Sequence, residues 1–153
     1  MKNGRTEGGT LISQVNQVSQ RVWHDVLSRN GLEDLAGARG RVIFALWNEE
    51  KIPIKKLVEK TSLDKATLTG IIDRLERDGY VKRMPSPDDK RATLICRTGK
   101  DEVFKSKVPK ASDQQNKLFY KGFSTSEIKE FEDYLKRILD NCREAEEKLL
   151  KEK

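Results

Sequence analysis

Residues 54–98 constrain the fold more than any other stretch of this chain, because several local signals follow one another there without interruption. The first part predicts a short helix behind Pro53, a tight turn at 61–63 and a second helix that Asp64 can cap. The second helix is amphipathic, since its apolar side chains follow the i, i+3, i+4, i+7 rule: Leu68, Ile71, Ile72 and Leu75. The stretch therefore predicts a helix-turn-helix.

A charged β-hairpin is expected directly after this helix pair. Gly79 marks the end of the second helix. Residues 80–84 and 91–96 contain β-favouring side chains, and residues 85–89 are turn formers. A helix-turn-helix followed by such a hairpin, or wing, suits duplex DNA, because the second helix fits the major groove and a basic wing tip reaches a minor groove.

The excess positive charge of the chain lies in the same region. The formal net charge is +6. Residues 51–97 contain twelve basic and seven acidic side chains, whereas residues 1–50 contain six of each and residues 98–153 contain thirteen and twelve. A generically basic protein would spread the excess evenly. Its concentration in one segment indicates a polyanionic partner.

Two helices are expected before the winged segment. Thr10 can cap the first, and Gly31 ends it. An apolar stripe runs along this helix: Leu11, Val15, Val18, Val22 and Val26. The second helix is expected over about 35–48, with a turn over residues 49–52 behind it.

Two more helices are expected after the wing. Thr98, with Asp101 three residues on, can cap a helix that Pro109 kinks or breaks. Ser124 and Glu127 form a capping box at the start of a long last helix. The apolar residues of that helix step by three and four, as in an a/d heptad seam: Ile128, Phe131, Leu135, Ile138, Cys142, Ala145 and Leu149.

The seam allows two interpretations. The last helix either packs on a core of its own chain or packs against another subunit. We favour the second, because a small winged domain needs neither this helix nor the first one. The residues expected at a dimer interface are Val15, Val18, Val22, Ile128, Phe131, Leu135, Ile138 and Cys142.

The predicted fold class is mainly α with a small β-hairpin wing (α+β). The winged helix-turn-helix DNA-binding domain is expected over residues 35–98. The helical dimerisation region is expected to combine residues 10–34 with residues 99–153, behind a flexible N-terminus at residues 1–9.

The side of the second helix opposite its apolar residues is small, polar and basic, as contact with base edges and phosphates requires. Together with two lysines of the preceding helix and the wing tip, the expected DNA-binding residues are Lys55, Lys56, Lys65, Ala66, Thr67, Thr69, Gly70, Arg74, Arg77, Asp89, Lys90 and Arg91. For any one of them the alternative is a solvated surface position.

Three of the positions on this surface carry more specific expectations. Gly70 allows either close approach to DNA or relief of crowding within the fold, and the sequence favours neither. Asp73 is expected to orient Arg77 four residues on. Asp89 is expected to fix the guanidinium of Arg91, which would enter a narrow minor groove.

Four features stand together in residues 63–98, LDKATLTGIIDRLERDGYVKRMPSPDDKRATLICRT: a Leu-Asp-Lys opening, an Asp-Arg-Leu-Glu run, a glycine that ends the helix, and an Asp-x-Arg wing. In this combination they resemble the core of the MarR family of winged-helix regulators. The resemblance implies a homodimer, each of whose winged domains reads half of an inverted repeat in double-stranded DNA. It places residues 65–74 in the major groove and Arg91, oriented by Asp89, in the minor groove.

The resemblance also implies a small aromatic effector, because many members of that family release DNA when such a molecule binds beside the DNA-binding lobe. The residues that could line its pocket are Trp23, His24, Phe44 and Trp47. The alternative is that the aromatics belong to the core and His24 is a satisfied polar group. A peroxide-sensing branch has a reactive cysteine in its first helix, which this chain lacks. Cys96 and Cys142 are expected to be buried packing residues.

The expected function is that of a sequence-specific transcriptional regulator, a dimeric repressor in the cytoplasm. The alternative is an architectural or protein-interaction module without sequence specificity. We exclude an enzyme, because no nucleophile with a base, carboxylate pair or phosphate-binding glycine loop stands out. No cofactor or metal is expected from one histidine and two distant cysteines. No membrane span is expected, because no apolar run approaches ~20 residues.

Overall fold

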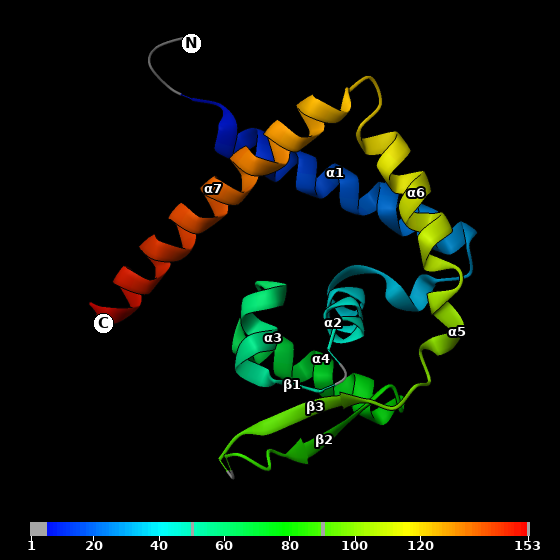
Figure 1. Ribbon diagram of the computed structural model, residues 1–153, viewed down its shortest axis with the longest axis vertical. Coiled ribbons are helices and arrows are strands. Elements are labelled where there is room, and N and C mark those ends of the chain that lie inside the picture. The colour runs from blue at the N-terminus through cyan, green and yellow to red at the C-terminus, as the bar shows by residue number, and fades with distance from the viewer. Residues whose placement is uncertain (1–5, 50, 90, 153) are drawn as a thin grey trace. The chain divides into compact units, whose positions relative to one another are not determined.

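The predicted helix-turn-helix and wing are both present in the computed structural model, which describes residues 6–49, 51–89 and 91–152 (Figure 1). The chain forms two compact units, Met1–Gln115 and Asn116–Lys153. The first unit contains the winged part. The fold is mostly helical with one small sheet, so the predicted fold class is confirmed.

Three helical segments precede the winged part: α1 (Gly8–Arg29), the 3-10 turn η1 (Glu33–Leu35) and α2 (Gly37–Trp47). The predicted cap by Thr10 is wrong, because α1 begins at Gly8, before Thr10, and no side chain among the described residues caps it. Gly31 follows the end of α1 as predicted, with a φ of 64°.

A close contact between α2 and η1 explains a glycine in the middle of α2. A β-carbon on Gly40 would lie 1.9 Å from the carbonyl oxygen of Leu35, so no side chain fits there. Because η1 occupies residues 33–35, α2 begins two residues later than predicted.

The sheet has three antiparallel strands in the order β1-β3-β2: β1 (Lys51–Pro53), β2 (Val81–Pro85) and β3 (Thr93–Arg97). The two strands of the wing were predicted, but β1 was expected to be part of a turn, and that expectation is wrong. Ile52 pairs with Ile95 of the central strand, and both side chains are fully buried.

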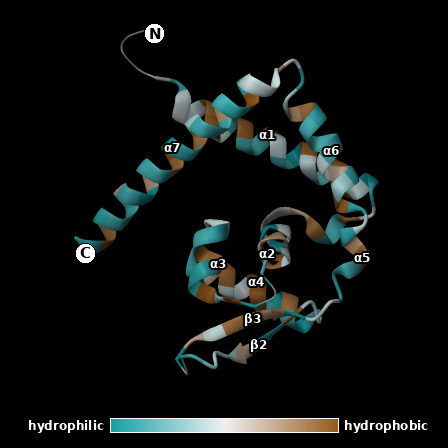
Figure 2. Cartoon of the chain, in the orientation of Figure 1, coloured by the Kyte–Doolittle hydropathy of each residue, from teal (hydrophilic) through white to brown (hydrophobic). Residues whose placement is uncertain are grey.

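The helices α3 (Ile54–Thr61) and α4 (Lys65–Arg77) contribute to the same core as α2 and the sheet. Figure 2 shows apolar residues gathered where these elements meet. The largest fully buried side chains are Leu27, Leu32, Leu35, Val42, Ile43, Leu46, Ile52, Leu57, Leu68, Ile72, Leu75 and Ile95. The predicted apolar side of α4 is therefore the buried one, with Ile71 half-buried at its margin.

The end of α4 is fastened to the chain that follows the wing. Gly79 has a φ of 78°, as a helix-ending glycine requires. The hydroxyl of Thr98 donates to its carbonyl oxygen at 2.7 Å, and the ammonium of Lys100 donates to the carbonyl of Asp78 at 2.7 Å. The prediction that Thr98 caps a helix is wrong, because its hydroxyl holds this turn instead.

The helix predicted after the wing is broken in two, α5 (Glu102–Lys105) and α6 (Val108–Phe119). The break falls just before Pro109, in agreement with the prediction.

The second unit contains the long helix α7 (Thr125–Lys151), which begins with the predicted capping box. The Ser124 N–H donates to the Glu127 carboxylate at 2.7 Å, and the Glu127 N–H donates to the Ser124 hydroxyl at 3.3 Å. No residue of α7 is buried. Over the described part of the chain, no helix has both the length and the apolar character needed to cross a membrane.

Candidate DNA interface

Asp64 fixes the start of α4. Its carboxylate accepts hydrogen bonds from the hydroxyl of Thr67 at 2.5 Å and from the N–H of the same residue at 2.8 Å, so the predicted N-cap is confirmed. These bonds lower the pKa of Asp64 below its usual value. Ser62, with a φ of 52°, makes the sharp turn between α3 and α4.

The face of α4 predicted to contact DNA is open to solvent. Its exposed residues are Lys65, Ala66, Thr67, Thr69, Arg74 and Arg77. Gly70 is half-buried, yet a β-carbon added there would meet no described atom within 4 Å outside its own helix backbone. Relief of crowding within the fold, one of the two explanations for this glycine, is therefore wrong.

Two threonines of this face already use their hydroxyl protons within the protein. Thr67 donates to Asp64, and Thr69 donates to the carbonyl of Lys65 at 2.8 Å. A hydroxyl that donates in this way keeps only lone pairs for another partner. For both threonines, a methyl contact with thymine fits this geometry better than donation to phosphate.

A pair of carboxylates on α4 holds the wing to the helix. Arg83 of β2 binds Asp73 at 2.5 Å and also pairs with Glu76. The prediction that Asp73 orients Arg77 is wrong, because β2 packs along α4 and brings the guanidinium of Arg83 to that carboxylate. Burial would lower the pKa of Arg83, but its hydrogen bonds to the two carboxylates raise it overall.

Most cations predicted to contact DNA have no carboxylate partner. In the described part of the chain, ion pairs are absent at Lys55, Lys65, Arg74, Arg77 and Arg91. Lys56 differs, because it pairs with Glu49 at 2.9 Å, and Lys60 binds the same carboxylate at 2.7 Å. The unpaired set keeps its full charge available to an external polyanion.

Side chains at the wing tip hold the backbone of the turn. The hydroxyl of Ser86 accepts from the N–H groups of Asp88 and Asp89 at 3.3 and 3.4 Å, and Asp89 accepts from the N–H of Arg91 at 2.9 Å. The prediction that Asp89 fixes the Arg91 guanidinium is therefore wrong, because the short carboxylate closes an Asx turn instead. Arg91 is exposed, and Lys90 lies outside the described residues.

The structure places the four candidate effector residues in different settings. The rings of Phe44 and Trp47 meet edge to face with centroids 5.1 Å apart, and Trp23 is half-buried. All three pack against the hydrophobic core, whereas His24 is exposed. An effector pocket formed by these residues stays a prediction.

The residues expected at a dimer interface leave apolar surface uncovered on the single chain. Val15, Val18 and Ile138 are 45, 50 and 43% exposed. The other apolar members are half-buried: Val22, Ile128, Phe131 and Leu135. Cys96 is buried as predicted, but Cys142 is exposed, because no element of its own unit covers that part of α7.

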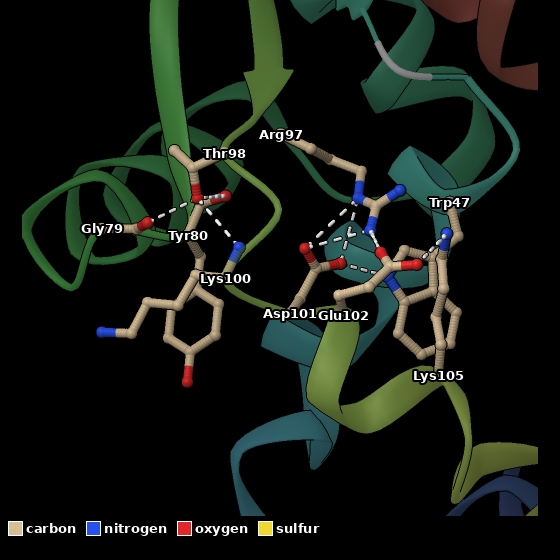
Figure 3. Close-up of polar contacts among 9 residues, drawn as sticks. All are labelled: Trp47, Gly79, Tyr80, Arg97, Thr98, Lys100, Asp101, Glu102 and Lys105. Carbon is tan, nitrogen blue, oxygen red and sulfur yellow. Dashed lines mark hydrogen bonds and ion pairs between the residues drawn. The ribbon is translucent and has the colours of Figure 1, made fainter.

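One buried ion-pair network was not predicted (Figure 3). The guanidinium of Arg97 binds the carboxylate of Asp101 at 3.0 and 3.1 Å and that of Glu102 at 2.8 Å. Asp101, which is 2% exposed, also accepts from the indole N–H of Trp47. Burial would lower the pKa of Arg97, but these carboxylates raise it overall. The four-residue spacing of Arg97 and Asp101 is visible in the sequence, but it indicates an ion pair only within a helix.

An open helix-turn-helix with cations unpaired among the described residues, followed by a two-stranded wing, defines a winged-helix DNA-binding protein. Residues 38–93 match the MarR family. The chain is 36% identical over 108 residues to the HTH-type transcriptional regulator SarZ of Staphylococcus haemolyticus, which covers 71% of this chain and 72% of that protein. It is 30% identical over 107 residues to MgrA of Staphylococcus aureus, which covers 70 and 71%.

The structure is also similar to that of a cysteine-to-serine variant of E. coli MarR complexed with operator DNA. The TM-score is 0.74 at 29% identity, covering 86% of this chain and 92% of that one. The chain therefore belongs to the MarR family of DNA-binding transcriptional regulators.

Proposed function

We propose that this protein is a homodimeric repressor that binds an inverted-repeat operator and is released from it by a small aromatic effector. The observation that carries the proposal is that the cations around α4 differ in whether they form an ion pair within the protein. Arg83 of β2 is paired with two carboxylates of α4, whereas Lys65, Arg74 and Arg77 on the exposed face of α4 have no ion pair among the described residues. In this arrangement α4 reads the major groove, and Arg91 of the wing enters the adjacent minor groove.

The proposal of a homodimer is supported by the apolar residues that each unit exposes. In α1 these are Leu11, Ile12, Val15 and Val18, and in α7 they include Tyr134, Ile138 and Leu139. Exposed apolar stripes of this length mark an interaction surface. A second copy of the chain is the partner that we propose, because the heptad spacing of α7 suits packing against another helix. Two copies would present two copies of α4 to an inverted repeat.

The proposal of an effector is supported by the aromatic residues at the end of α2. Phe44 and Trp47 form an edge-to-face pair that remains half-buried, and the half-buried Trp23 packs against the same hydrophobic core. Half-buried aromatic rings offer apolar surface to a planar ligand.

Selection of bound sites from a random duplex library, at near-physiological salt, tests the operator proposal. We expect enrichment of an inverted repeat with half-sites separated by about one helical turn, roughly 10 bp. A Lys65→Ala/Arg74→Ala double variant, selected in parallel, should enrich nothing. Binding that is tight at low salt, falls steeply with added salt and enriches no sequence in the unsubstituted protein would support the architectural alternative.

Repression and release are tested separately on the selected operator. Placed between a promoter and its start site, the operator should lower transcription in vitro when the protein is added. A library of small phenolic compounds should contain members that restore transcription and weaken operator binding. Activation by the protein would contradict the repressor proposal, and a library without effect would contradict the effector proposal alone.

A further inference from the structure

The outer face of the wing sheet has a hollow between two lysines. Lys51 of β1 and Lys82 of β2 both pair with Cys96 of the central strand. Residues that are paired across neighbouring strands point to the same side of a sheet. The three side chains therefore form a row, with a small thiol between two long cationic chains.

This row lies on the side of the sheet away from α4. Successive residues of a strand point to opposite faces. Ile95, next to Cys96, faces the core, and Arg83, next to Lys82, binds the carboxylates of α4. Cys96 is only 2% exposed, yet it does not belong to the core cluster that contains Ile95. The hollow is thus separate from the proposed DNA-contacting face.

The hollow is the floor of a cavity of about 470 Å³, within the size range of small-molecule sites. Its wall comes from the chain between β3 and α5. The lining residues are Lys51, Lys82, Met84, Cys96, Arg97, Thr98, Gly99, Glu102 and Lys105. Four of them are cationic and one is anionic.

The single carboxylate of the cavity is already occupied. Glu102 binds Arg97 at 2.8 Å and Lys105 at 3.2 Å. Figure 3 shows the ion pair between Glu102 and Arg97. Lys51 and Lys82 have no ion pair among the residues that the structure describes. Positive charges that converge on a concave surface concentrate the local field and attract anions.

We propose that this cavity binds a small organic anion that carries more than one carboxylate or phosphate group. Lys51 and Lys82 each bind one anionic group, from opposite sides of the Cys96 floor. Met84 contacts the carbon skeleton above the buried Cys96, and Lys105 closes the side formed by α5. Lys51 and Lys82 lie on opposite sides of Cys96, which is why we assign a molecule with at least two charged groups.

Isothermal titration of the full chain with citrate and with pyrophosphate, each at constant ionic strength, tests the proposal. We expect one ligand per chain. A Lys51→Gln/Lys82→Gln variant should bind at least about tenfold more weakly, because each lysine supplies a charge-assisted hydrogen bond. The matched control is Lys55→Gln/Lys65→Gln, which removes the same charge from α3 and α4 and should keep the affinity of the unsubstituted protein.

A second variant blocks the cavity without changing its charge. Cys96→Leu places a larger side chain on the floor between the lysines and should abolish citrate binding while operator binding persists, which also shows that the variant is folded. The proposal is overturned if neither probe binds, if the lysine variant binds within twofold of the unsubstituted protein, or if only the control loses binding. The last result would place the anions on the DNA-contacting face.

Discussion

At the scale of single residues, Gly70 separates what the fold needs from what DNA binding needs. A glycine in the middle of a helix is about 1 kcal/mol less favourable than alanine, and the described structure has open space where its β-carbon would lie. We expect Gly70→Ala to raise the free energy of unfolding by about 0.5–1 kcal/mol. We also expect it to weaken operator binding, because the added methyl group would lie between the backbone of α4 and the base edges.

Urea unfolding and fluorescence anisotropy with labelled operator measure the two effects of Gly70→Ala. The matched control is Lys110→Ala on α6, which should leave operator affinity nearly unchanged. A variant that is more stable and binds the operator as tightly as the unsubstituted protein would show that close approach at Gly70 is not required.

Arg91 provides the residue-scale test of the wing. Its guanidinium is exposed and unpaired in the described structure, so its truncation removes no contact within the fold. We expect Arg91→Ala to leave the melting temperature unchanged, to weaken operator binding about tenfold or more, and to reduce the preference for A·T pairs in the flanks. Site selection with the variant, compared with Lys110→Ala, measures both. An unchanged flank preference would rule out minor-groove contact by this residue.

The sequence predicted which residues belong to the candidate DNA interface better than it predicted the contacts that these residues make. The cap by Asp64 and the helix-ending Gly79 were predicted correctly, because each depends on neighbours within a few residues. The partners of Asp73 and Asp89 were not, because a carboxylate has several reachable donors. The tertiary structure brings the guanidinium of Arg83 to Asp73, and Asp89 accepts a hydrogen bond from the backbone N–H of Arg91.

At the scale of elements, the cap of α4 links the stability of the recognition helix to pH. The pKa of Asp64 is lowered by its bonds to Thr67, so its stabilising effect is present above its unfolded-state pKa and is lost as pH falls through the lower folded-state value. We expect Asp64→Ala to lower the free energy of unfolding at neutral pH, because the first turn of α4 loses its side-chain cap. Urea unfolding at pH 7 and at pH 3 should show that the difference between variant and unsubstituted protein shrinks in acid. A difference that is equal at both pH values would contradict the role of the ionised cap.

The junction between β3 and α5 depends on a buried ion pair. The side chains of Arg97 and Asp101 are 11 and 2% exposed, and Trp47 of α2 donates to the same carboxylate. Removing Asp101 leaves the guanidinium with only the exposed Glu102 and leaves the indole N–H of Trp47 without its acceptor. We therefore expect Asp101→Ala to lower the free energy of unfolding by about 3 kcal/mol.

Two further variants identify the cause of that loss. Arg97→Leu/Asp101→Ala should recover much of the stability, because the buried guanidinium is then removed together with its buried carboxylate. Glu102→Gln, at the exposed partner of the same arginine, should change stability little. If the double variant is less stable than Asp101→Ala alone, the guanidinium stabilises the junction mainly through contacts other than Asp101.

Strand β1 was not predicted from the sequence, because its formation depends on residues far along the chain. The apolar spacing of α4 and the capping box of α7 are local, and both were predicted. Strand β1 has only three residues and exists because Ile52 pairs with Ile95 far along the chain. A three-residue segment carries too little periodicity to predict a strand.

At the scale of the whole molecule, the single chain leaves apolar residues of α1 and α7 exposed that a partner subunit would bury. The heptad seam of α7 was predicted from spacing, and Cys142 on that seam was predicted to be buried, yet it is exposed in one chain. A sequence pattern indicates that a face is apolar but does not state which surface covers it. We expect a second copy to do so, and this expectation has a direct chemical readout in Cys142.

Ile138 precedes Cys142 by about one helical turn on the seam and is 43% exposed. We expect Ile138→Glu to convert the dimer into monomers in sedimentation equilibrium, because the buried carboxylates of two subunits could not be solvated. Operator affinity should fall about 100-fold or more, since the half-sites would no longer be bound by one linked pair of domains. Iodoacetamide should modify Cys142 faster in this variant than in the unsubstituted protein.

Asn141→Glu is the matched control, because it places the same charge on α7 beside the seam and should preserve the dimer, the operator affinity and the slow modification of Cys142. If Ile138→Glu is still a dimer in sedimentation equilibrium, the seam of α7 is not the dimer interface. If it is monomeric but binds the full operator as tightly as before, the two half-sites are not read by one dimer. In the first case α1, with its own exposed stripe of Leu11, Val15 and Val18, becomes the surface on which two copies meet.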